Sequence, residues 1–560
     1  MLTDKRKFTG RSIDMRLLKI MAAILLALAL TAISCACGKG TRDTIDNEGT
    51  PKITAEGRYD PAIDLVSVKS VDATIKFLEG EDIHNNVWTR AYAEELGINM
   101  SYMWVVDASQ YRQKLTATVM SGDIPDVFLC DPLLFKLLYD SDMIEDLTDI
   151  YETFASEKTR YVLEQDKTAL PCSSIDGKLM GLPITDAAIA NAPLLWIRQD
   201  WMRDLKIDPP ESMQDLMAIA TRFVNEDPDN NGANDTTGLA VSKELWSAFG
   251  GLQGFFNGFH AYPRIWFEKD GALVYGSVQP EMKQALAALQ DMYKRGEIDQ
   301  EFGVKDSNKI SEAIANSKIG IEFGVWWNPY SPLNLSQANY PDAYWKAYPI
   351  PSVDDKPAKS QYSAAIGSII VVRKGYQYPE AVVKMINFWC DNILYNQDQA
   401  VRDKYLGSLD HPDVVKYKYT SFHLWEPNAM LKSHVKLKEA LAKRSTAGLT
   451  QDELQRYLII SAYFDQGIKE AWVEVATNGE NGAVTILDSI SRDRGMLNRF
   501  YGAPTVTMSE KMGALHTMED EMITKIIMGE PLDEFDRFVK EWHSLGGEDI
   551  TREVNEWWQK

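Results

Sequence analysis

Segments with the spacing of strands and helices alternate along the first part of this chain, and their order limits the folds that the chain can adopt. Apolar and polar residues alternate over 71–77, which predicts a strand. We expect a helix over 87–96, a strand over 98–105, a helix over 111–120 and a short strand over 127–129. This β-α-β-α-β order is typical of an open α/β sheet with helices on its faces.

A second run of the same kind starts at residue 193 with a strand over 193–197. In the helix that follows, apolar residues keep a 3.6-residue period up to Val224, and Ser212 and Asp215 are expected to cap its start. Further strands are expected over 319–323, 347–350 and 366–372, and further helices over 379–390 and 452–475. The fold class is therefore α/β along the whole chain.

The chain of 560 residues is long enough for two or three domains, and its net charge of −22 disfavours binding to nucleic acid. Outside the N-terminal segment the cysteines are Cys130, Cys172 and Cys390, whose spacing indicates no disulfide framework. The seven histidines show no metal-ligand spacing, so a zinc or other transition-metal catalytic site is not expected.

The N-terminal segment has the pattern of an export signal. Arg16 and Lys19 precede an apolar run over 20–33 that is too short to cross a membrane, and Cys35 and Cys37 follow it. Small residues before Cys35 resemble the bacterial lipobox, which implies a lipid on Cys35, with Cys37 as the alternative. A cleaved signal without lipid remains open, as does a start at Met15. We expect a signal peptide over 1–35 and a flexible tether over 36–68.

Three blocks of sequence, in order along the chain, carry a family resemblance. The segment SGDIPD over 121–126 resembles a segment of bacterial extracellular solute-binding proteins, the receptors of ABC importers. The block LWIRQDW over 195–201, with the helix and the acidic loop up to 239, resembles the large carbohydrate receptors of this class. The C-terminal segments 502–505, 525–529 and 545–555 resemble the LplA-like group, which is related to alginate-oligosaccharide receptors. The resemblance covers essentially the whole mature chain.

The resemblance implies a periplasmic-binding-protein-like fold of type II, with two α/β lobes that close over a ligand by a hinge. The first lobe is expected over 69–190 plus 362–430, and the second over 191–361 plus 431–560, including the C-terminal helices. The implied function is a lipid-anchored receptor on the outer face of the cell membrane, without enzyme activity. Such a receptor captures an oligosaccharide and delivers it to ABC transporter permease subunits, and we expect a monomer.

An acidic loop follows the helix that ends near Val224. Oxygen-bearing side chains stand at positions 1, 3, 5 and 9 around a glycine at position 6, as in an EF-hand loop, and a backbone carbonyl is expected at position 7. The expected ligands are Asp227, Asp229, Asn231, Ala233 and Asp235. Position 12 is Gly238, so another residue must complete the shell. The loop predicts a structural Ca²⁺ site; the alternative is a simple polar turn.

Aromatic residues are the first candidates for ligand contact, because flat rings pack against sugar rings. The chain has 15 tryptophans, most of which must lie in the core. Trp326 and Trp327 follow an expected strand, and two consecutive side chains cannot both point into one core. We predict that at least one of them contacts ligand; Trp246, Phe255 and Phe256 are weaker candidates.

Polar residues near the expected ends of the first strands are the second set of candidates. Glu81, Asn85 and Trp88 follow the first strand, and Asp131 follows the third. In an open α/β sheet, such positions face the ligand crevice. The alternative for each is a solvated polar loop.

Two other functions remain open from the sequence. An exported carbohydrate-active enzyme needs a pair of carboxylates across a cleft. The chain has 81 acidic residues, which are enough to supply such a pair. However, no GxSxG or HExxH block occurs. A receptor of the same fold for peptides is the second alternative.

Overall fold

The computed structural model describes residues 50–71, 75–185, 188–363, 368–407, 411 and 414–559. Lys52–Lys560 forms one compact unit. The expected export signal, with Cys35 and Cys37, lies outside the described residues. In the part of the chain that the structure describes, no helix is both long and apolar enough to cross a membrane.

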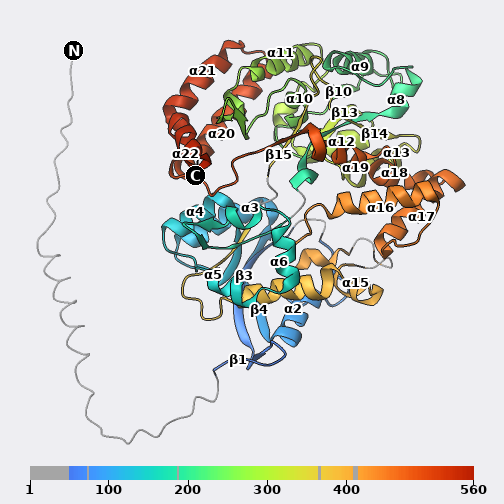
Figure 1. Cartoon of the computed structure of the whole chain (residues 1–560). Helices are drawn as coiled ribbons and strands as arrows, with labels where there is room; N and C mark the ends of the chain where they lie inside the picture. The colour runs from blue at the N-terminus through green and yellow to red at the C-terminus, as the bar shows by residue number, and fades with distance from the viewer. Residues whose placement is uncertain are drawn as a thin grey trace, which may run out of the picture. The chain divides into compact units, whose positions relative to one another are not determined.

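The first group of strands combines segments from distant parts of the chain (Figure 1). β3 (Ile63–Val71) runs parallel to β4 (Ile98–Asp107). β16 (Ile369–Val372) pairs antiparallel with β5 (Val127–Cys130) on one side and with β8 (Leu182–Pro183) on the other. A strand from much later in the chain is therefore the central strand of the three-stranded sheet β5-β16-β8.

The second group is a four-stranded mixed sheet in the order β10-β13-β9-β14. Its strands are β10 (Thr237–Leu239), β13 (Ile319–Gly324), β9 (Leu194–Arg198) and β14 (Trp345–Tyr348). β9 pairs antiparallel with both β13 and β14, and β10 is parallel to β13. Every residue of β9 and β13 is buried, as expected for central strands covered on both faces.

Short two-stranded ribbons complete the β structure. They pair β1 (Lys52–Ile53) with β2 (Tyr59–Asp60), β6 (Ser174–Ile175) with β7 (Lys178–Leu179), β11 (Trp266–Lys269) with β12 (Ala272–Tyr275), and β15 (Ser360–Tyr362) with β17 (Gly495–Leu497).

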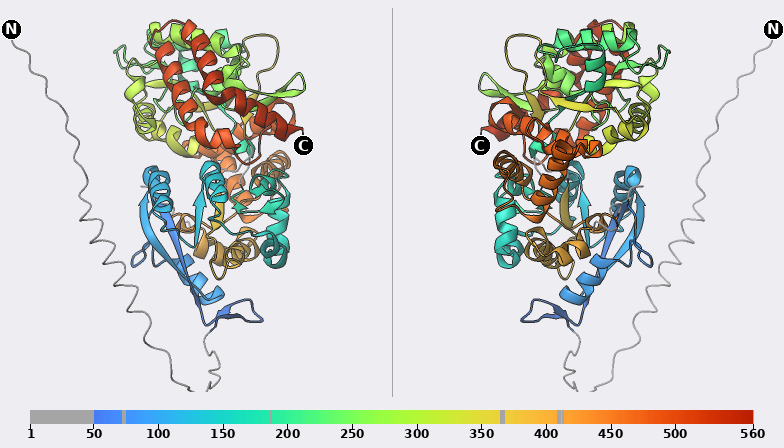
Figure 2. Two further views of the ribbon diagram at one scale, coloured as in Figure 1. Left: turned by 90° about the vertical axis from the view of Figure 1, so that its left-hand side faces the viewer. Right: turned by 90° about the vertical axis from the view of Figure 1, so that its right-hand side faces the viewer.

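Helices surround both groups of strands (Figure 2). Those whose sequence lies near or among the strands of the first group are α2 (Val87–Ala91), α3 (Ala108–Met120), α4 (Pro132–Asp140), α5 (Thr148–Phe154), α6 (Glu157–Glu164), α7 (Ala169–Cys172), α14 (Ala381–Trp389) and α15 (Gln399–Tyr405). The others are α8 (Gln199–Asp204), α9 (Met213–Asn225), α10 (Gln253–Gly258), α11 (Glu281–Lys294), α12 (Ser307–Ala315), α13 (Asn334–Asn339), α16 (Ala429–Lys443), α17 (Gln451–Gln466), α18 (Trp472–Asn478), α19 (Ala483–Ser489), α20 (Val506–Ile527), α21 (Asp533–Trp542) and α22 (Glu548–Trp558).

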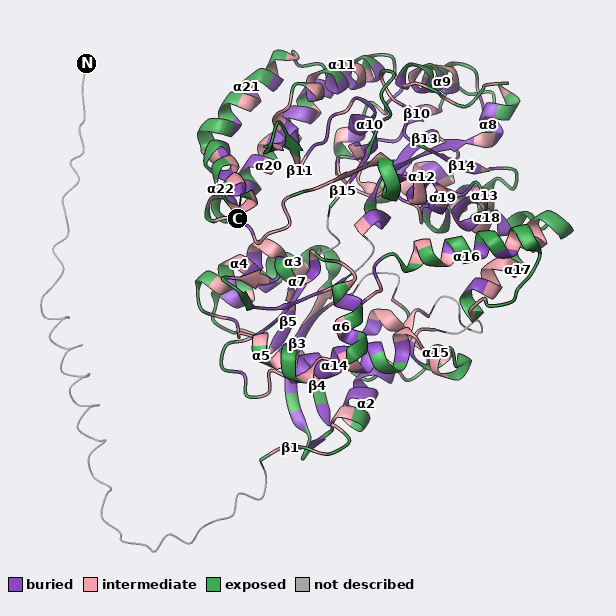
Figure 3. Ribbon diagram, viewed as in Figure 1, coloured by how far each residue is buried: buried purple, intermediate pink, exposed green. Residues whose placement is uncertain are grey.

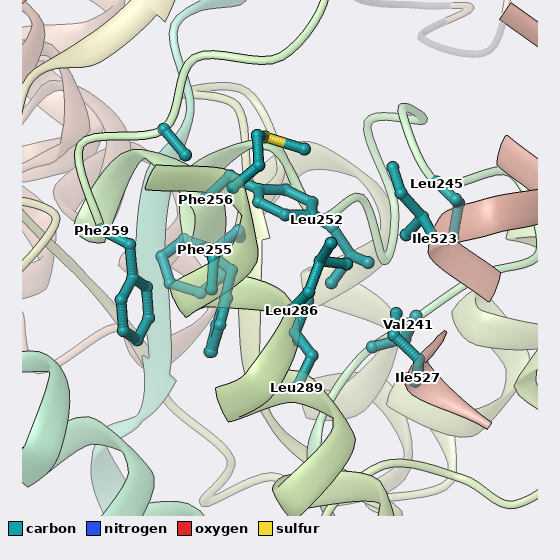
Figure 4. Packing of buried hydrophobic residues seen from close by; sticks show 14 of the residues in the cluster. Val241, Leu245, Leu252, Phe255, Phe256, Phe259, Leu286, Leu289, Ile523 and Ile527 are labelled. Atoms are coloured by element: carbon teal, nitrogen blue, oxygen red, sulfur yellow. The ribbon is translucent and has the colours of Figure 1, made fainter. Parts of the chain in front are cut away.

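Separate hydrophobic clusters fill the two groups, and Figure 3 shows buried residues throughout the sheets. The largest cluster joins the mixed sheet to α9, α10, α11 and the C-terminal helices, and part of it is drawn in Figure 4. Phe255, Phe256, Leu286 and Ile523 are fully buried there, so the two phenylalanines serve packing rather than binding. These clusters hold the sheet that carries the candidate site.

Most predicted elements are confirmed, including the capping box between Ser212 and Asp215 at the start of α9. The first strand was predicted wrongly: β3 covers Ile63–Val71, and 75–77 form no strand. Ile63 and Leu65 are buried, so the folded body begins before the expected end of the tether at residue 68. The single helix expected over 452–475 is interrupted because Gly467 adopts a left-handed conformation after α17.

Candidate functional site

Two loops meet at the end of β13. Asn328 accepts a hydrogen bond from the backbone N–H of Val325 at 2.8 Å through its Oδ1. Its Nδ2 donates to the carbonyl of Ala248 at 3.2 Å, which ties the loop after β13 to the loop before α10. A Cβ on Gly324 would lie 2.4 Å from Asn328 Nδ2, so this close approach requires a glycine. One asparagine therefore fixes the geometry of both loops.

A pocket of about 230 Å³ opens between these loops. Trp246, Gln253, Phe323 and Val325 line it, together with other residues of the two loops and with Asn191 and Pro193 before β9. We call it the Trp246 pocket. It combines an indole ring and apolar walls with an amide and a hydroxyl, from Gln253 and Ser247. Rings and a few placed polar groups are the usual composition of a small-molecule site.

Side chains from two other segments hold the Trp246 ring. The indole N–H donates to Asp520 Oδ1 at 2.7 Å, and the guanidinium of Arg264 lies 4.7 Å from the ring centroid. Arg264 also donates to the same Asp520 oxygen at 2.6 Å. The ring stacks on Phe256 with centroids 6.0 Å apart. Trp246 is thus placed before any ligand arrives, which lowers the entropic cost of binding.

A buried carboxyl group lies on the strand that leads into the pocket. Glu322 on β13 is fully buried, and its Oε1 accepts a hydrogen bond from the N–H of Gly250 at 3.3 Å. Burial raises the pKa of Glu322 to about 8, so the group is mainly protonated at neutral pH. Its Oε2 has no partner among the described residues. Glu322 therefore supports the loop around Gly250 as a neutral acid.

The two consecutive tryptophans point in different directions. Trp327 is half-buried and meets Phe249 edge to face, with ring centroids 5.6 Å apart. Trp326 is also half-buried and packs against the cluster that contains Leu333 and Trp345. The sequence predicted that the two indole rings do not point into one core, and the structure confirms this. That one of them contacts ligand stays a prediction. Phe249 belongs to the loop that begins with Trp246, so Trp327 lies close to the Trp246 pocket.

The candidates of the first group of strands form separate sets. Arg90 forms an ion pair with Glu81 and donates to Asn85 Oδ1 at 3.0 Å. Trp88 was expected to face the ligand crevice, but it is 1% exposed and stacks on Trp389 with centroids 5.6 Å apart. A helix turns consecutive residues to different faces, and Trp88 lies on the inner one.

Asp131 has a structural role at the start of α4. Its Oδ1 accepts from the backbone N–H of Leu134 at 2.9 Å, as an N-cap does, and its Oδ2 pairs with Arg112 at 2.9 Å. Both oxygens are therefore engaged within the protein, although the side chain is partly exposed.

The predicted calcium loop brings its side chains together. Asn231 donates to Asp229 at 2.9 Å and to Asp235 at 3.1 Å, and both Asn231 and Gly232 donate backbone N–H groups to Asp227. Asp229 Oδ1 is buried without a partner among the described residues. Burial and then the neighbouring Asp227 raise the pKa of Asp229.

A lysine from outside the loop balances its charge. Lys318, just before β13, forms ion pairs with Asp235 and, at 3.8 Å, with Asp229. In the described part of the chain, no group of three or more His, Cys, Asp or Glu side chains is arranged to hold a metal. The convergence of oxygens and the orphaned Asp229 oxygen fit a cation; the ammonium of Lys318 now neutralises part of that charge.

Sequence reasoning missed the residues that fix the Trp246 pocket. Arg264, Asp520 and the pair Glu322 and Asn328 come from three separate segments, and only the folded chain brings them together. The one available signal was Asn328, which directly follows the two tryptophans.

Comparison with known proteins identifies the kind of molecule that carries this site. Residues 79–391 match the family described as "Bacterial extracellular solute-binding protein". The chain is 24% identical over 234 residues to lipoprotein LipO of Bacillus subtilis, covering 41% of this chain and 45% of LipO, less than half of its length. It is 23% identical over 559 residues to the polygalacturonan/rhamnogalacturonan-binding protein YtcQ of the same organism, covering 95% of this chain and 97% of YtcQ.

A solved structure shares the fold. The substrate-binding protein FusA of S. pneumoniae, solved as an EF-hand mutant with fructo-nystose, aligns with a TM-score of 0.61 and 15% identity. The alignment covers 89% of this chain and 99% of FusA. The α/β fold of solute-binding proteins predicted from the sequence is thereby confirmed.

Proposed function

Because the chain belongs to the family of bacterial extracellular solute-binding proteins, we propose that it captures an oligosaccharide outside the cytoplasm and delivers it to an ABC transporter permease. The observation that carries this proposal is the Trp246 pocket, whose indole ring is held in place by Arg264 and Asp520. A fixed aromatic wall offers apolar contact to the C–H groups of a sugar ring, and nearby amide and hydroxyl groups bond to sugar hydroxyls. YtcQ and FusA, whose names and titles give saccharide ligands, support the same class.

Binding without turnover is part of this proposal. The relatives that match are substrate-binding proteins rather than enzymes. Among the described residues no acid lines the Trp246 pocket, and the buried Glu322 on β13, whose pKa burial raises to about 8, supports a loop. A glycosidase needs two carboxylates that face each other across a cleft. Among the described residues, the lining of this pocket contains no such pair. We therefore expect bound sugar to remain intact.

We also propose a lipid anchor on Cys35, supported by the lipobox pattern and by the likeness to LipO. The receptor would then stay at the outer face of the membrane. Labelled fatty acid incorporated by the wild type and lost in Cys35→Ala supports this assignment; loss only in Cys37→Ala moves the anchor to Cys37.

A structural Ca²⁺ at the loop Asp227–Asp235 is a further part of the proposal. The side chains of Asp227, Asp229, Asn231 and Asp235 and the carbonyl of Ala233 would hold it, and Lys318 would have to move away. Hard oxygen donors at this spacing suit Ca²⁺. The ion would stabilise the turn between α9 and β10.

A thermal-shift screen of the full-length protein tests the main proposal. The panel contains neutral and acidic oligosaccharides and, as the alternative class, peptides, with product analysis of each hit. Stabilisation by a sugar that remains intact supports the receptor. Cleavage of the sugar supports an enzyme, and stabilisation by peptides alone overturns the carbohydrate class while keeping the family.

A further inference from the structure

A second and larger pocket lies away from the Trp246 pocket. It has a volume of about 740 Å³ and lies between the edge strand β14 and helices α16, α17 and α18. α16 and α17 lie side by side (Figure 1). We call it the α17 pocket. Its lining residues are Gln199, Tyr344, Lys346, Ala347, Lys438, Leu441, Ala442, Arg444, Tyr457, Ile460, Ser461, Tyr463, Phe464, Asp465, Val475, Ala476, Glu480 and Asn481.

The two pockets share none of their lining residues. β9 separates β14 from β13 in the sheet, so the α17 pocket lies at the edge strand while the Trp246 pocket lies at the end of β13. Its volume falls within the range of about 300–1,000 Å³ that is usual for ligand sites.

Apolar and aromatic side chains form one part of the pocket wall. Ile460 and Ala476 are buried beneath it. Tyr463 and Phe464 meet edge to face with centroids 5.2 Å apart, and Tyr344 lies across from α17 on the side of β14. Phe464 is 67% exposed, so its ring is accessible to a ligand.

Several polar side chains of the pocket have no partner among the described residues, whereas Gln199 accepts a hydrogen bond from Tyr348 and Arg444 pairs with Asp465. Among the described residues, no hydrogen bond is formed by the side chains of Tyr457, Tyr463, Ser461 or Asn481, or by the hydroxyl of Tyr344. In a folded protein most such groups pair internally or with water, so several open hydroxyl and amide groups around one cavity are available to a ligand.

The charge of the pocket is positive in a chain of strongly negative net charge. Lys346, Lys438 and Arg444 line it against two carboxylates, Asp465 and Glu480. Arg444 and Asp465 pair with each other at 3.7 Å. In the described chain neither Lys346 nor Lys438 forms an ion pair, and the Lys346 ammonium lies 5.1 Å from the Tyr348 ring centroid. Two ammonium groups and the Glu480 carboxylate thus have no ion pair among the described residues, and the remaining positive charge favours an anionic group.

We propose that the α17 pocket is a second saccharide-binding site that prefers a short sugar carrying a carboxylate. The rings of Tyr344, Tyr463 and Phe464 pack against the sugar faces, and the open phenol and amide groups bond to its hydroxyls. Lys346 and Lys438 pair with the carboxylate. The α17 pocket binds its ligand whether or not the Trp246 pocket is occupied.

The first test measures binding by calorimetry with the full-length Trp246→Ala variant, in which the other pocket is weakened. The probes are the trisaccharide of galacturonic acid and the neutral trisaccharide of galactose with the same linkage. We expect the acidic probe to bind at least fivefold more tightly than the neutral one, and its affinity to fall as salt increases. No binding of the acidic probe, or equal binding of both, overturns the proposal.

Substitutions in the pocket locate the site. Lys346→Met in the same background should weaken the acidic probe at least fivefold and leave the neutral probe unchanged, whereas Tyr463→Ala should weaken both. The control is Lys243→Met, which removes an exposed lysine outside the pocket. If Lys346→Met and Tyr463→Ala bind like the control, the acidic sugar binds elsewhere and the proposal fails. The receptor function is judged separately, by oligosaccharide binding to the protein with Trp246 intact.

Discussion

The two pockets on the mixed sheet differ in how the protein holds their aromatic residues. Around the Trp246 pocket, Asn328, Arg264 and Asp520 are all engaged in hydrogen bonds within the protein. Around the α17 pocket, the phenols of Tyr457 and Tyr463 are open among the described residues. The protein fixes the Trp246 ring before a ligand binds. The phenol groups of the α17 pocket can instead form hydrogen bonds with a ligand.

This difference teaches where affinity can come from. A ring held by a cation and a carboxylate loses little freedom when it binds, so its contact energy is retained as affinity. Open side chains on helices lose rotamer freedom on binding and depend more on charge and hydrogen bonds. We therefore expect the Trp246 pocket to respond most to loss of a ring.

The largest expected effect is loss of the preplaced ring. Trp246→Ala should weaken oligosaccharide binding at least tenfold, equivalent to about 1.4 kcal/mol or more, with no loss of fold. Calorimetry with the sugar identified by the screen measures it. Trp104→Ala, which removes a half-buried indole from the first group of strands, is the matched control. Equal affinity for the sugar in the two variants would show that the Trp246 pocket is not part of the binding site.

The next effect tests the neighbouring loop. Trp326→Ala together with Trp327→Ala should weaken the same sugar about tenfold, chiefly through Trp327, which lies against Phe249. Single variants separate the two rings, and circular dichroism checks the fold. A folded double variant with unchanged affinity would limit the site to the loop that contains Trp246.

A smaller effect is expected from the acidic loop. Chelation of Ca²⁺ should lower the melting temperature by a few degrees, and added Ca²⁺ should restore it, because an ion that binds only the native state stabilises it by mass action. Differential scanning calorimetry measures both. Asp229→Asn should abolish the response, whereas Asp208→Asn, outside the loop, should keep it. If chelation does not change the melting temperature of the wild type, the loop binds no structural Ca²⁺ and is a turn whose charge Lys318 neutralises.

The smallest effect concerns pH. The folded-state pKa of Glu322, about 8, lies above its unfolded value of 4.5. Between these values the folded state holds a proton that the unfolded state has lost, so stability falls as pH rises through this window and levels off above it. Glu519, whose pKa burial raises to about 7, acts in the same direction at lower pH.

Glu322→Gln keeps an acceptor for the Gly250 N–H and removes the titration. Its melting temperature should therefore fall less between pH 7 and pH 8 than that of the wild type. Glu226→Gln, at an exposed position, serves as the control. Identical slopes in the wild type and Glu322→Gln would mean that Glu322 is charged in the folded protein.

Local patterns predicted the elements whose periodicity is strong. The helix from Met213 to Asn225 was expected because its apolar spacing and its cap agree, and the structure has both. The first strand was misplaced because alternation occurs on both sides of Val71, and only burial against the rest of the first group selects 63–71. Trp88 was misassigned because the sequence does not show which face of a short helix is covered.

The α/β order, the family resemblance, the tryptophan pair after β13 and the acidic loop could all be recognised from the amino-acid sequence, because each is encoded in residues that are neighbours along the chain. Tertiary structure alone decided which tryptophan is held as a wall of a pocket, which acid is buried and neutral, and that helices α16 to α18 enclose a second cavity beside β14. Arg264 and Asp520 are far apart in the chain, and burial and charge pairing act only once folding has brought such groups within a few ångströms.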